Sequence, residues 1–156
     1  MASTIHLDRT DFAILEKLQD NALLSNKQVA AEVNLSPSAC HERVKRLKEG
    51  GILQGSHAVV DPKAYGVSFE AMFLIQLDRH EALLVEEFLQ EVIALREVKS
   101  VALISGAYDI VAHLRVRDID HLKSLAFEKF TKRPYITKIE SSIVYDFKEN
   151  RVQKPL

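Results

Sequence analysis

The sequence of 156 residues is poor in the features that mark exported or membrane-spanning proteins. Its one cysteine, Cys40, excludes an internal disulfide, and Asp8, Arg9 and Asp11 interrupt the N-terminal segment before an export signal can form. The longest apolar run covers residues 71–75, whereas a membrane span needs roughly 18 residues or more. We therefore expect a cytoplasmic protein that spans no membrane.

An excess of charge of one sign is also missing. The 21 Lys and Arg residues nearly balance 22 Asp and Glu residues, which leaves a formal net charge of -1. This balance is unlike that of a non-specific nucleic-acid coat, so any site for a polyanion must be local. The apolar share of 47% is normal for a globular chain and excludes wholesale disorder.

Glycine is scarce and unevenly placed, because four of the five glycines fall between residues 50 and 66. Apolar residues before this region recur at helical spacing, and runs of period two appear after it. We predict a helical domain at 1–51, a linking segment and hinge at 52–66, a mixed domain at 67–148 and a tail at 149–156. Both domains are small enough to need support from a partner.

Three helices are predicted in the first domain. Asp8 is a good N-cap for a helix that ends near residue 20, and Ser25 with Gln28 forms the capping-box pattern of a helix over about 26–33. A third helix begins at Ser36 and runs to the glycines at 50 and 51, after a tight turn in which Asn34 tolerates a left-handed conformation. This spacing is that of a helix-turn-helix. The first helix should bury Phe12, Ile14, Leu15 and Leu18.

The third helix separates an apolar stripe from a basic surface. At 100° per residue the buried stripe is Cys40, Val44 and Leu47. From residue 36 to 48, four basic residues stand against one acidic residue, an excess of three positive charges on a nearly neutral chain. A plain three-helix packing unit has the same spacing, but it does not predict that this helix should be basic. We therefore predict double-stranded DNA as the partner. Ser36 and Ser38 at the helix N-terminus suit a phosphate, and His41, Lys45 and Arg46 lie outside the buried stripe.

The second domain predicts an alternation of strands and helices in the order βαββαβ. Strands are expected at 69–78, 98–105, 108–116 and 136–147. A helical pattern with Leu84, Val85, Phe88 and Val92 facing inward follows the first strand, and a second helix opens near Asp118 and closes at Arg133-Pro134. This order is that of a ferredoxin-like sandwich, so the whole chain is α+β with an N-terminal, winged-helix-like helix-turn-helix domain. The sheet should be apolar on its uncovered face as well, through Met72, Leu74, Val101, Leu103 and Val111. Such a face must meet another subunit, so we expect a homodimer.

The sequence resembles the Lrp/AsnC family of bacterial and archaeal transcription factors. The resemblance is carried by Leu7–Asp11, by the run from Ser25 to Gly55 and, within it, by Leu35-Ser36-Pro37 and Gly51-Ile52, and it continues to about Lys148. It implies that the recognition helix enters the major groove through the segment with Ser38, Cys40, His41, Lys45 and Arg46. The stripe places Cys40 in the core instead, and the face analysis supports the other four, so with Ser36 they are the predicted DNA contacts. The resemblance further implies a linking strand at 52–61 and assembly of dimers into tetramers or octamers.

The stretch Ser105-Gly106-Ala107-Tyr108-Asp109 resembles the family's loop for a small effector, usually an amino acid. Gly106 allows close backbone approach, Asp109 can accept from an α-ammonium group, and turn amides can hold a carboxylate. Taken alone, the same stretch is a short hairpin with a capping Asp. The family often places hydroxyl residues at two positions of the last strand; here Ser141 keeps one and Ile139 lacks the other.

Two other functions are possible for such a sequence: that of an enzyme and that of an architectural DNA-binding protein. An enzyme is disfavoured because the six histidines lack metal-ligand spacing and no Gly-rich phosphate loop is present, so we expect no metal, no cofactor and no catalytic residue. His113 is interpreted as a surface or interface residue. An architectural DNA-binding protein without an effector has the same recognition helix, and only the ligand site separates it from an effector-responsive regulator.

Overall fold

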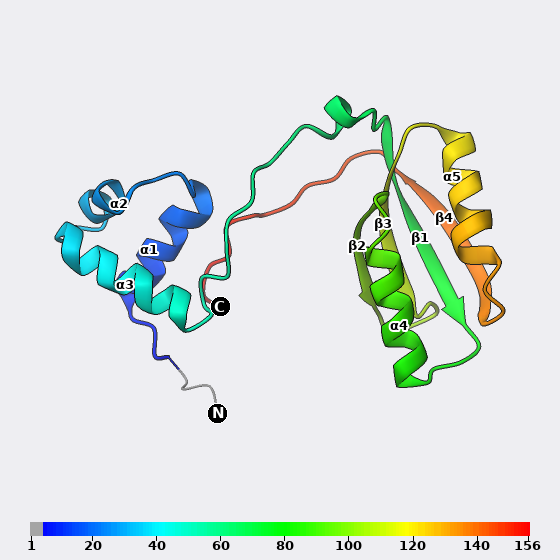
Figure 1. The fold of residues 1–156 in the computed structure, drawn as a ribbon, viewed down its shortest axis with the longest axis horizontal. Coiled ribbons are helices and arrows are strands. Elements are labelled where there is room, and N and C mark those ends of the chain that lie inside the picture. Colours follow the sequence, from blue (N-terminus) through cyan, green and yellow to red (C-terminus); the bar gives the residue numbers. More distant parts are fainter. Residues whose placement is uncertain (1–4) are drawn as a thin grey trace. The chain divides into compact units, whose positions relative to one another are not determined.

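The computed structural model describes residues 5–156, which fold into two compact units connected by two stretches of chain. Unit 1 contains the residues up to Val59 together with Lys148–Leu156, and unit 2 is Val60–Phe147 (Figure 1). The predicted tail therefore belongs to the unit that contains the N-terminal helices. Among residues 5–156, no helix is long and apolar enough to cross a bilayer.

Unit 1 consists of three helices, α1 (Arg9–Asp20), α2 (Asn26–Glu32) and α3 (Pro37–Glu49). The predicted caps are confirmed: Asp8 and Ser25 each complete a capping box, and Ser36 caps α3. Asn34 has a φ of 56°, so the left-handed turn between α2 and α3 is confirmed as well.

The core of unit 1 joins all three helices. Its buried side chains are Ile14, Val29, Ala30, Cys40, Val44 and Leu47. The predicted α3 stripe is thus confirmed, and burial raises the pKa of the Cys40 thiol, as suits a packing residue. Phe12 was expected inside but is 37% exposed, because it lines a surface groove beside Ile52 and not the core between the helices.

The linking segment forms no strand. Residues 52–61 have no strand pairing in the single chain, because a strand requires a hydrogen-bonded neighbour. A short 3-10 helix, η1 (Pro62–Tyr65), follows; Asp61 caps it, and Gly66 ends it with a φ of 75°. The described residues of unit 1 likewise contain no strand, so no β-wing accompanies its three helices.

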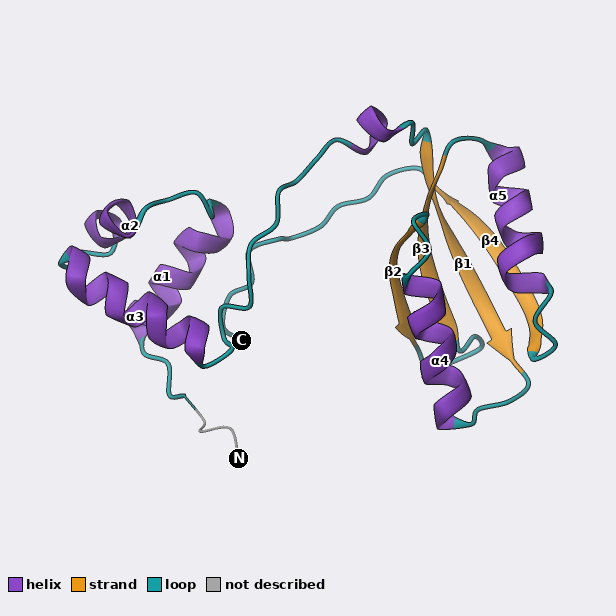
Figure 2. Ribbon diagram, in the orientation of Figure 1, coloured by secondary structure: helices purple, strands orange, loops and turns teal. Residues whose placement is uncertain are grey.

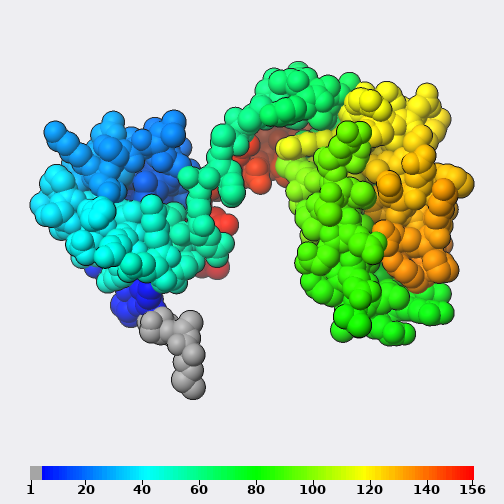
Figure 3. All heavy atoms as spheres, viewed as in Figure 1, coloured from blue at the N-terminus to red at the C-terminus, as the bar shows by residue number. Residues whose placement is uncertain are grey.

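Unit 2 has the predicted βαββαβ order. Its elements are β1 (Phe69–Leu77), α4 (Ala82–Ile93), β2 (Val98–Leu103), β3 (Ile110–Val116), α5 (Ile119–Leu125), the π-helix η2 (Ala126–Thr131) and β4 (Ile136–Val144). The strands form one antiparallel sheet in the order β2-β3-β1-β4. Both long helices cover the same sheet face (Figure 2), and in the space-filling view α4 and the α5–η2 segment form the visible surface of this unit (Figure 3).

An aromatic cluster holds the helices on the sheet. Phe73 on β1 and Phe130 on η2 meet edge to face at a centroid distance of 5.2 Å, and Phe88 on α4 meets Phe130 at 6.3 Å. Such pairs add about 0.5–1.5 kcal/mol each beyond the area they bury. All three rings are fully buried.

The uncovered sheet face differs from the prediction in two strands. Val101 pairs with Ala112 and Leu103 with Ile110, and both partners are buried on the helix-covered face. Because directly paired residues share a face, placing Val101 and Leu103 on the open face was wrong. A register shift between Val98 and Ser100 interrupts simple alternation there. Met72, Leu74 and Val111 do lie on the open face, where Leu74 pairs with Val111.

His113 is buried, so of its two interpretations, a surface or an interface residue, the first was wrong. It pairs with Met72 on the open sheet face, where the interface alternative stays a prediction. Only 4% of His113 is exposed, because the Phe147 ring lies over it at a centroid distance of 4.9 Å. Its Nε2 lies 2.6 Å from the Oε2 atom of Glu70, and burial lowers the pKa of the imidazole. The Nζ atom of Lys99 lies over the Phe147 ring, 4.1 Å from its centroid.

Candidate nucleic-acid interface and effector loop

The N-terminal end of α3 presents two hydroxyl groups to solvent. Ser36 Oγ accepts a hydrogen bond from Ala39 N at 3.2 Å and lies 3.2 Å from Ser38 Oγ. Both serines are exposed, next to backbone amides that have no partner inside the helix. A helix end of this kind favours a phosphate group, so the predicted positions of Ser36 and Ser38 suit contact with a nucleic-acid backbone.

His41 connects the two helices of the motif. Its Nδ1 lies 2.9 Å from Asn26 Nδ2 at the start of α2. Because an amide nitrogen only donates, Nδ1 is the acceptor, and the Nε2 atom remains to meet a ligand. His41 is exposed, and so is Lys45 one helical turn further along α3.

Arg46 is held by a buried carboxylate of α1. Its Nη2 lies 2.5 Å from Asp11 Oδ2, and Asp11 is 0% exposed. Arg43 reaches the same carboxylate at 2.9 Å and Asp8 at 2.7 Å. Two of the four basic residues counted on α3 are therefore paired inside unit 1. The 32–35 residues of separation along the chain explain why no sequence pattern indicated these pairs.

The network also fixes the charge of Asp8. A hydrogen bond from Arg43 lowers the pKa of Asp8 from 3.8 to about 2. Asp8 thus caps α1 and, as an anion, holds α3 against it. Asp8 was recognised in the sequence as the cap of α1, but the part that Asp8 and Asp11 play in holding α3 against α1 was missed.

The loop predicted to bind an effector is longer than the expected two-residue break. β2 ends at Leu103 and β3 begins at Ile110, and a backbone hydrogen bond of 2.7 Å from Ile104 N to Asp109 O closes the loop between them. Gly106 has a φ of 128°, which side chains rarely allow, and a Cβ there would meet no atom within 4 Å. Ser105, Gly106 and Ala107 are all exposed, so their backbone groups are open to a ligand.

Asp109 uses both carboxylate oxygens within the chain. Its Oδ2 accepts from Leu77 N at 2.7 Å, and its Oδ1 lies 2.9 Å from Nε2 of the exposed His80. The Leu77 amide, followed by His80, lowers the pKa of Asp109, so the group is an anion. An ammonium group that binds Asp109 must take the place of His80 at Oδ1. Sequence reasoning missed His80, which comes from the segment after β1.

Tyr108 is joined to β4 by two charged side chains that were not predicted. Lys138 Nζ donates to its hydroxyl at 2.9 Å, and the hydroxyl donates to a carboxylate oxygen of Glu140. The Tyr108 hydrogen bond raises the pKa of Lys138 and lowers that of Glu140, so both stay charged. The sequence alone indicates that Lys138 and Glu140, two residues apart on one strand, lie on the same face. Their contact with Tyr108 depends on the order of the strands in the sheet.

Ser141 is not brought to this cluster. It pairs with Phe73 and therefore lies on the helix-covered side of β4, whereas Glu140, its neighbour, is on the other side. Ile139 packs against the core. The structure thus gathers Tyr108 and Asp109 with His80, Lys138 and Glu140 at one end of the sheet and leaves Ser141 apart.

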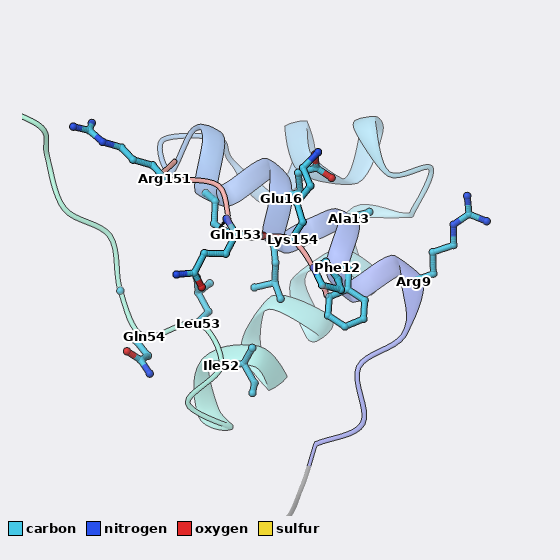
Figure 4. Close-up of a pocket in the computed structure, with 14 residues that line it drawn as sticks. Arg9, Phe12, Ala13, Glu16, Ile52, Leu53, Gln54, Arg151, Gln153 and Lys154 are labelled. Carbon is cyan, nitrogen blue, oxygen red and sulfur yellow. Dashed lines mark hydrogen bonds and ion pairs between the residues drawn. The ribbon is translucent and has the colours of Figure 1, made fainter. Parts of the chain in front are cut away.

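A separate groove of about 810 Å³ lies on unit 1 between α1, residues 52–55 and the C-terminal segment (Figure 4). Phe12, Ile52 and Leu53 supply apolar lining, and Arg9, Arg151 and Lys154 supply charge. None of the predicted DNA or effector residues lines it.

A helix-turn-helix unit with a polar recognition helix, followed by a ferredoxin-like unit with an open loop, defines a two-domain class of DNA-binding regulators. Comparison with known proteins agrees. Residues 7–54 match the winged helix-turn-helix DNA-binding family, and residues 70–152 match the Lrp/AsnC ligand binding domain. The chain belongs to the Lrp/AsnC family of transcriptional regulators, and it is not an enzyme.

Relatives match over nearly the whole chain. The transcriptional regulator AzlB of Bacillus subtilis is 30% identical over 152 residues, which are 97% of each protein. The leucine-responsive regulatory protein of Escherichia coli is 32% identical and covers 90% of this chain and 85% of its own.

Solved structures give the same result. Escherichia coli AsnC has a TM-score of 0.83 and 29% identity and covers 97% of this chain and 100% of its own. A transcriptional regulator from Neisseria meningitidis, solved as a complex with L-Met, has a TM-score of 0.87, 26% identity and coverage of 96% and 97%.

Proposed function

We propose that the protein is a sequence-specific transcriptional regulator whose assembly and DNA binding respond to a small effector, an amino acid. The observation that carries this proposal is the presence, in one chain, of a helix-turn-helix unit and a ligand-binding domain whose loop is exposed at residues 104–107. A similar regulator was solved with L-Met, which supports an amino acid as the ligand class. A protein that binds chromosomal DNA in this way works in the cytoplasm.

DNA contact is assigned to the exposed side of α3. Ser36 and Ser38 offer hydroxyl and amide donors to a phosphate, while His41 and Lys45 reach toward base edges and backbone. Arg46 is 47% exposed, so it can donate to DNA through the nitrogens that Asp11 leaves unused.

The active form is proposed to be a dimer. The open sheet face carries Met72, Leu74 and Val111, which the helices of the same chain do not cover. Two recognition helices placed about 34 Å apart then fit successive major grooves, so the operator is an inverted repeat. Dimers joining into tetramers or octamers bridge several such sites.

The effector acts through Asp109 and the loop at Ser105–Tyr108. An α-ammonium group replaces His80 at Asp109 Oδ1, and loop amides hold the carboxylate. A ligand that binds one assembly more tightly than another shifts the equilibrium between them by its differential affinity.

The effector proposal is tested by thermal melting of the full chain with each common amino acid. One or more should raise the melting temperature, and Asp109→Ala should abolish the rise. His80→Ala should keep it, since that change leaves the carboxylate in place. Absence of any rise, together with unchanged DNA affinity and assembly size for Asp109→Ala, would favour the architectural alternative.

DNA contacts are tested by the dependence of binding on salt. Lys45→Ala should weaken operator binding and reduce the slope of log affinity against log salt by about one for each subunit that contacts the DNA. Glu49→Ala, at the far end of the same helix, serves as the matched control. An unchanged slope for Lys45→Ala would remove this residue from the interface.

A further inference from the structure

The chain passes between the two units twice, and the two connections differ in length. The first is anchored on unit 1 at Leu53, whose amide donates to Leu47 O at 3.0 Å, and on the sheet at Ser68, whose amide donates to Val116 O at 2.9 Å. The second is anchored on unit 2 at Phe147 and on α1 of unit 1 at Gln153. Only residues 148–152 lie between the anchors of the second connection.

Side chains of unit 2 fix the start of the second connection. The Phe147 ring lies against His113, with centroids 4.9 Å apart, and beneath Lys99, whose Nζ is 4.1 Å from the ring centroid. His113 is itself buried and bound to Glu70. Phe147 is therefore part of the folded unit 2 and does not move freely with the C-terminal segment.

The end of the second connection is fixed on α1 by a set of four residues that we call the clasp: Glu16, Gln19, Gln153 and Lys154. The Gln19 side chain donates to Gln153 O at 3.0 Å and accepts from Gln153 N at 2.8 Å, which satisfies both backbone groups of one residue. Lys154 Nζ lies 2.9 Å from Glu16 Oε1. Figure 4 shows Gln153 and Lys154 lying along α1 at the edge of the groove.

Chain length then limits how far unit 1 can move from unit 2. Fully extended backbone spans about 3.3–3.6 Å per residue, so the second connection allows at most about 20 Å between Phe147 and Gln153. The first connection, even with its 3-10 helix, allows about 45 Å between Leu53 and Ser68. While the clasp is closed, the shorter connection sets the reach of unit 1. When it opens, the limit more than doubles.

We propose that the clasp determines which operator spacings the protein accepts. It does so by limiting the reach of the recognition helix on each subunit. This inference rests on the proposed dimer with two recognition helices. The clasp is solvent-exposed, so it can open while both units stay folded. Gln19 and Gln153 are then positioning residues for DNA recognition although neither lies on α3.

The first test changes the length of each connection separately. Six Gly and Ser residues are inserted after Asn150 in one variant and after Ser56 in a matched control. Both insertions add about 20 Å of reach, but only the first lengthens the limiting connection. Affinity is measured for inverted-repeat DNA at the best spacing and with one extra turn, about 10 base pairs, between half-sites.

Wild type and the control with the insertion after Ser56 should lose about tenfold or more in affinity on the DNA with the extra turn. The variant with the insertion after Asn150 should bind the two DNAs within about threefold of each other. Equal spacing preference in all three proteins would overturn the inference. No binding by wild type to any of the DNAs would overturn the proposed function, and this inference with it.

The second test opens the clasp without changing chain length. Glu16→Ala combined with Gln19→Ala should broaden the accepted spacing as the Asn150 insertion does. Gln54→Ala removes the same side-chain type from the same groove outside the clasp, and it should keep the wild-type preference. Melting curves establish that each variant is folded. A folded clasp variant with wild-type spacing preference would contradict the proposal.

Discussion

At the scale of single residues, Asp11 connects folding to DNA recognition. Its carboxylate is fully buried and accepts from the Asp8 amide, from Arg43 and from Arg46. A buried anion is costly unless it is paired, and here both cations come from the recognition helix. The same contact that neutralises Asp11 therefore sets the angle at which α3 lies against α1.

Asp11→Ala should destabilise unit 1 by roughly 2–4 kcal/mol, because it removes the buried partner of two guanidinium groups and one amide of the α1 capping box. Chemical unfolding of the full chain, followed by helical circular dichroism, measures the change. Asp20→Ala, an exposed acidic residue at the other end of α1, should change stability by about 0.5 kcal/mol or less. Equal effects of the two substitutions would show that the network does not stabilise the unit.

Because of Asp8, unit 1 should lose stability at acid pH. Its pKa is about 2 in the folded protein against 3.8 ordinarily, so its contribution to stability is complete above about pH 4 and is lost as the pH falls toward 2. Asp8→Asn keeps an N-cap but has no charge to lose. The melting temperature of this variant should therefore fall less steeply between about pH 4 and pH 2 than that of wild type. Parallel curves would contradict this.

At the scale of elements, local signals predicted helices better than strand ends. Caps, the left-handed turn and the α3 stripe are all set by neighbours within four residues, and they were predicted correctly. The face of Val101 depends on a register shift, and the start of β3 depends on the Asp109 amide bonding to Ile75 O. The linking strand needs a pairing partner that a single chain does not supply.

The residues of the candidate sites show the same difference between local signals and tertiary contacts. Periodicity alone identified the exposed positions of α3, and the loop motif identified Tyr108 and Asp109. The residues that position them, such as Asp11 and His80, are brought close only by tertiary contacts. Ser141 had the expected residue type, but pairing with Phe73 places it on the other side of the sheet.

The turn between α2 and α3 gives a prediction at this scale. Asn34 has a φ of 56°, a conformation that costs a residue with a branched Cβ about 1–2 kcal/mol. Asn34→Gly should leave stability within about 0.5 kcal/mol of wild type, and Asn34→Val should lower it by about 1–2 kcal/mol. Thermal unfolding compares the two. Because the residue is exposed, a stability of Asn34→Val as high as that of Asn34→Gly would mean that the turn changes shape to accommodate valine.

At the scale of the whole molecule, the chain has two small cores and one sheet face that its own helices leave open. Met72 and Leu74 lie on that face beside Val111, and next to them Glu70 and Arg115 form an ion pair with each other at 3.1 Å. An apolar strip inside a satisfied polar rim is the composition of a subunit interface. If the protein recognises DNA as this dimer, a substitution that prevents assembly through the open face should also weaken DNA binding.

Leu74→Arg tests this, because an added charge at the centre of the strip opposes burial but leaves the helix-covered core intact. Its mass in sedimentation should fall to that of a single chain, and operator affinity should fall by about a hundredfold or more, since one recognition helix must then bind alone. Leu83→Arg, on the exposed surface of α4, is the matched control and should keep both assembly and affinity. If Leu74→Arg became monomeric yet bound the inverted repeat as wild type does, single subunits would be sufficient for recognition. The open face would then serve some purpose other than placing two helices on DNA.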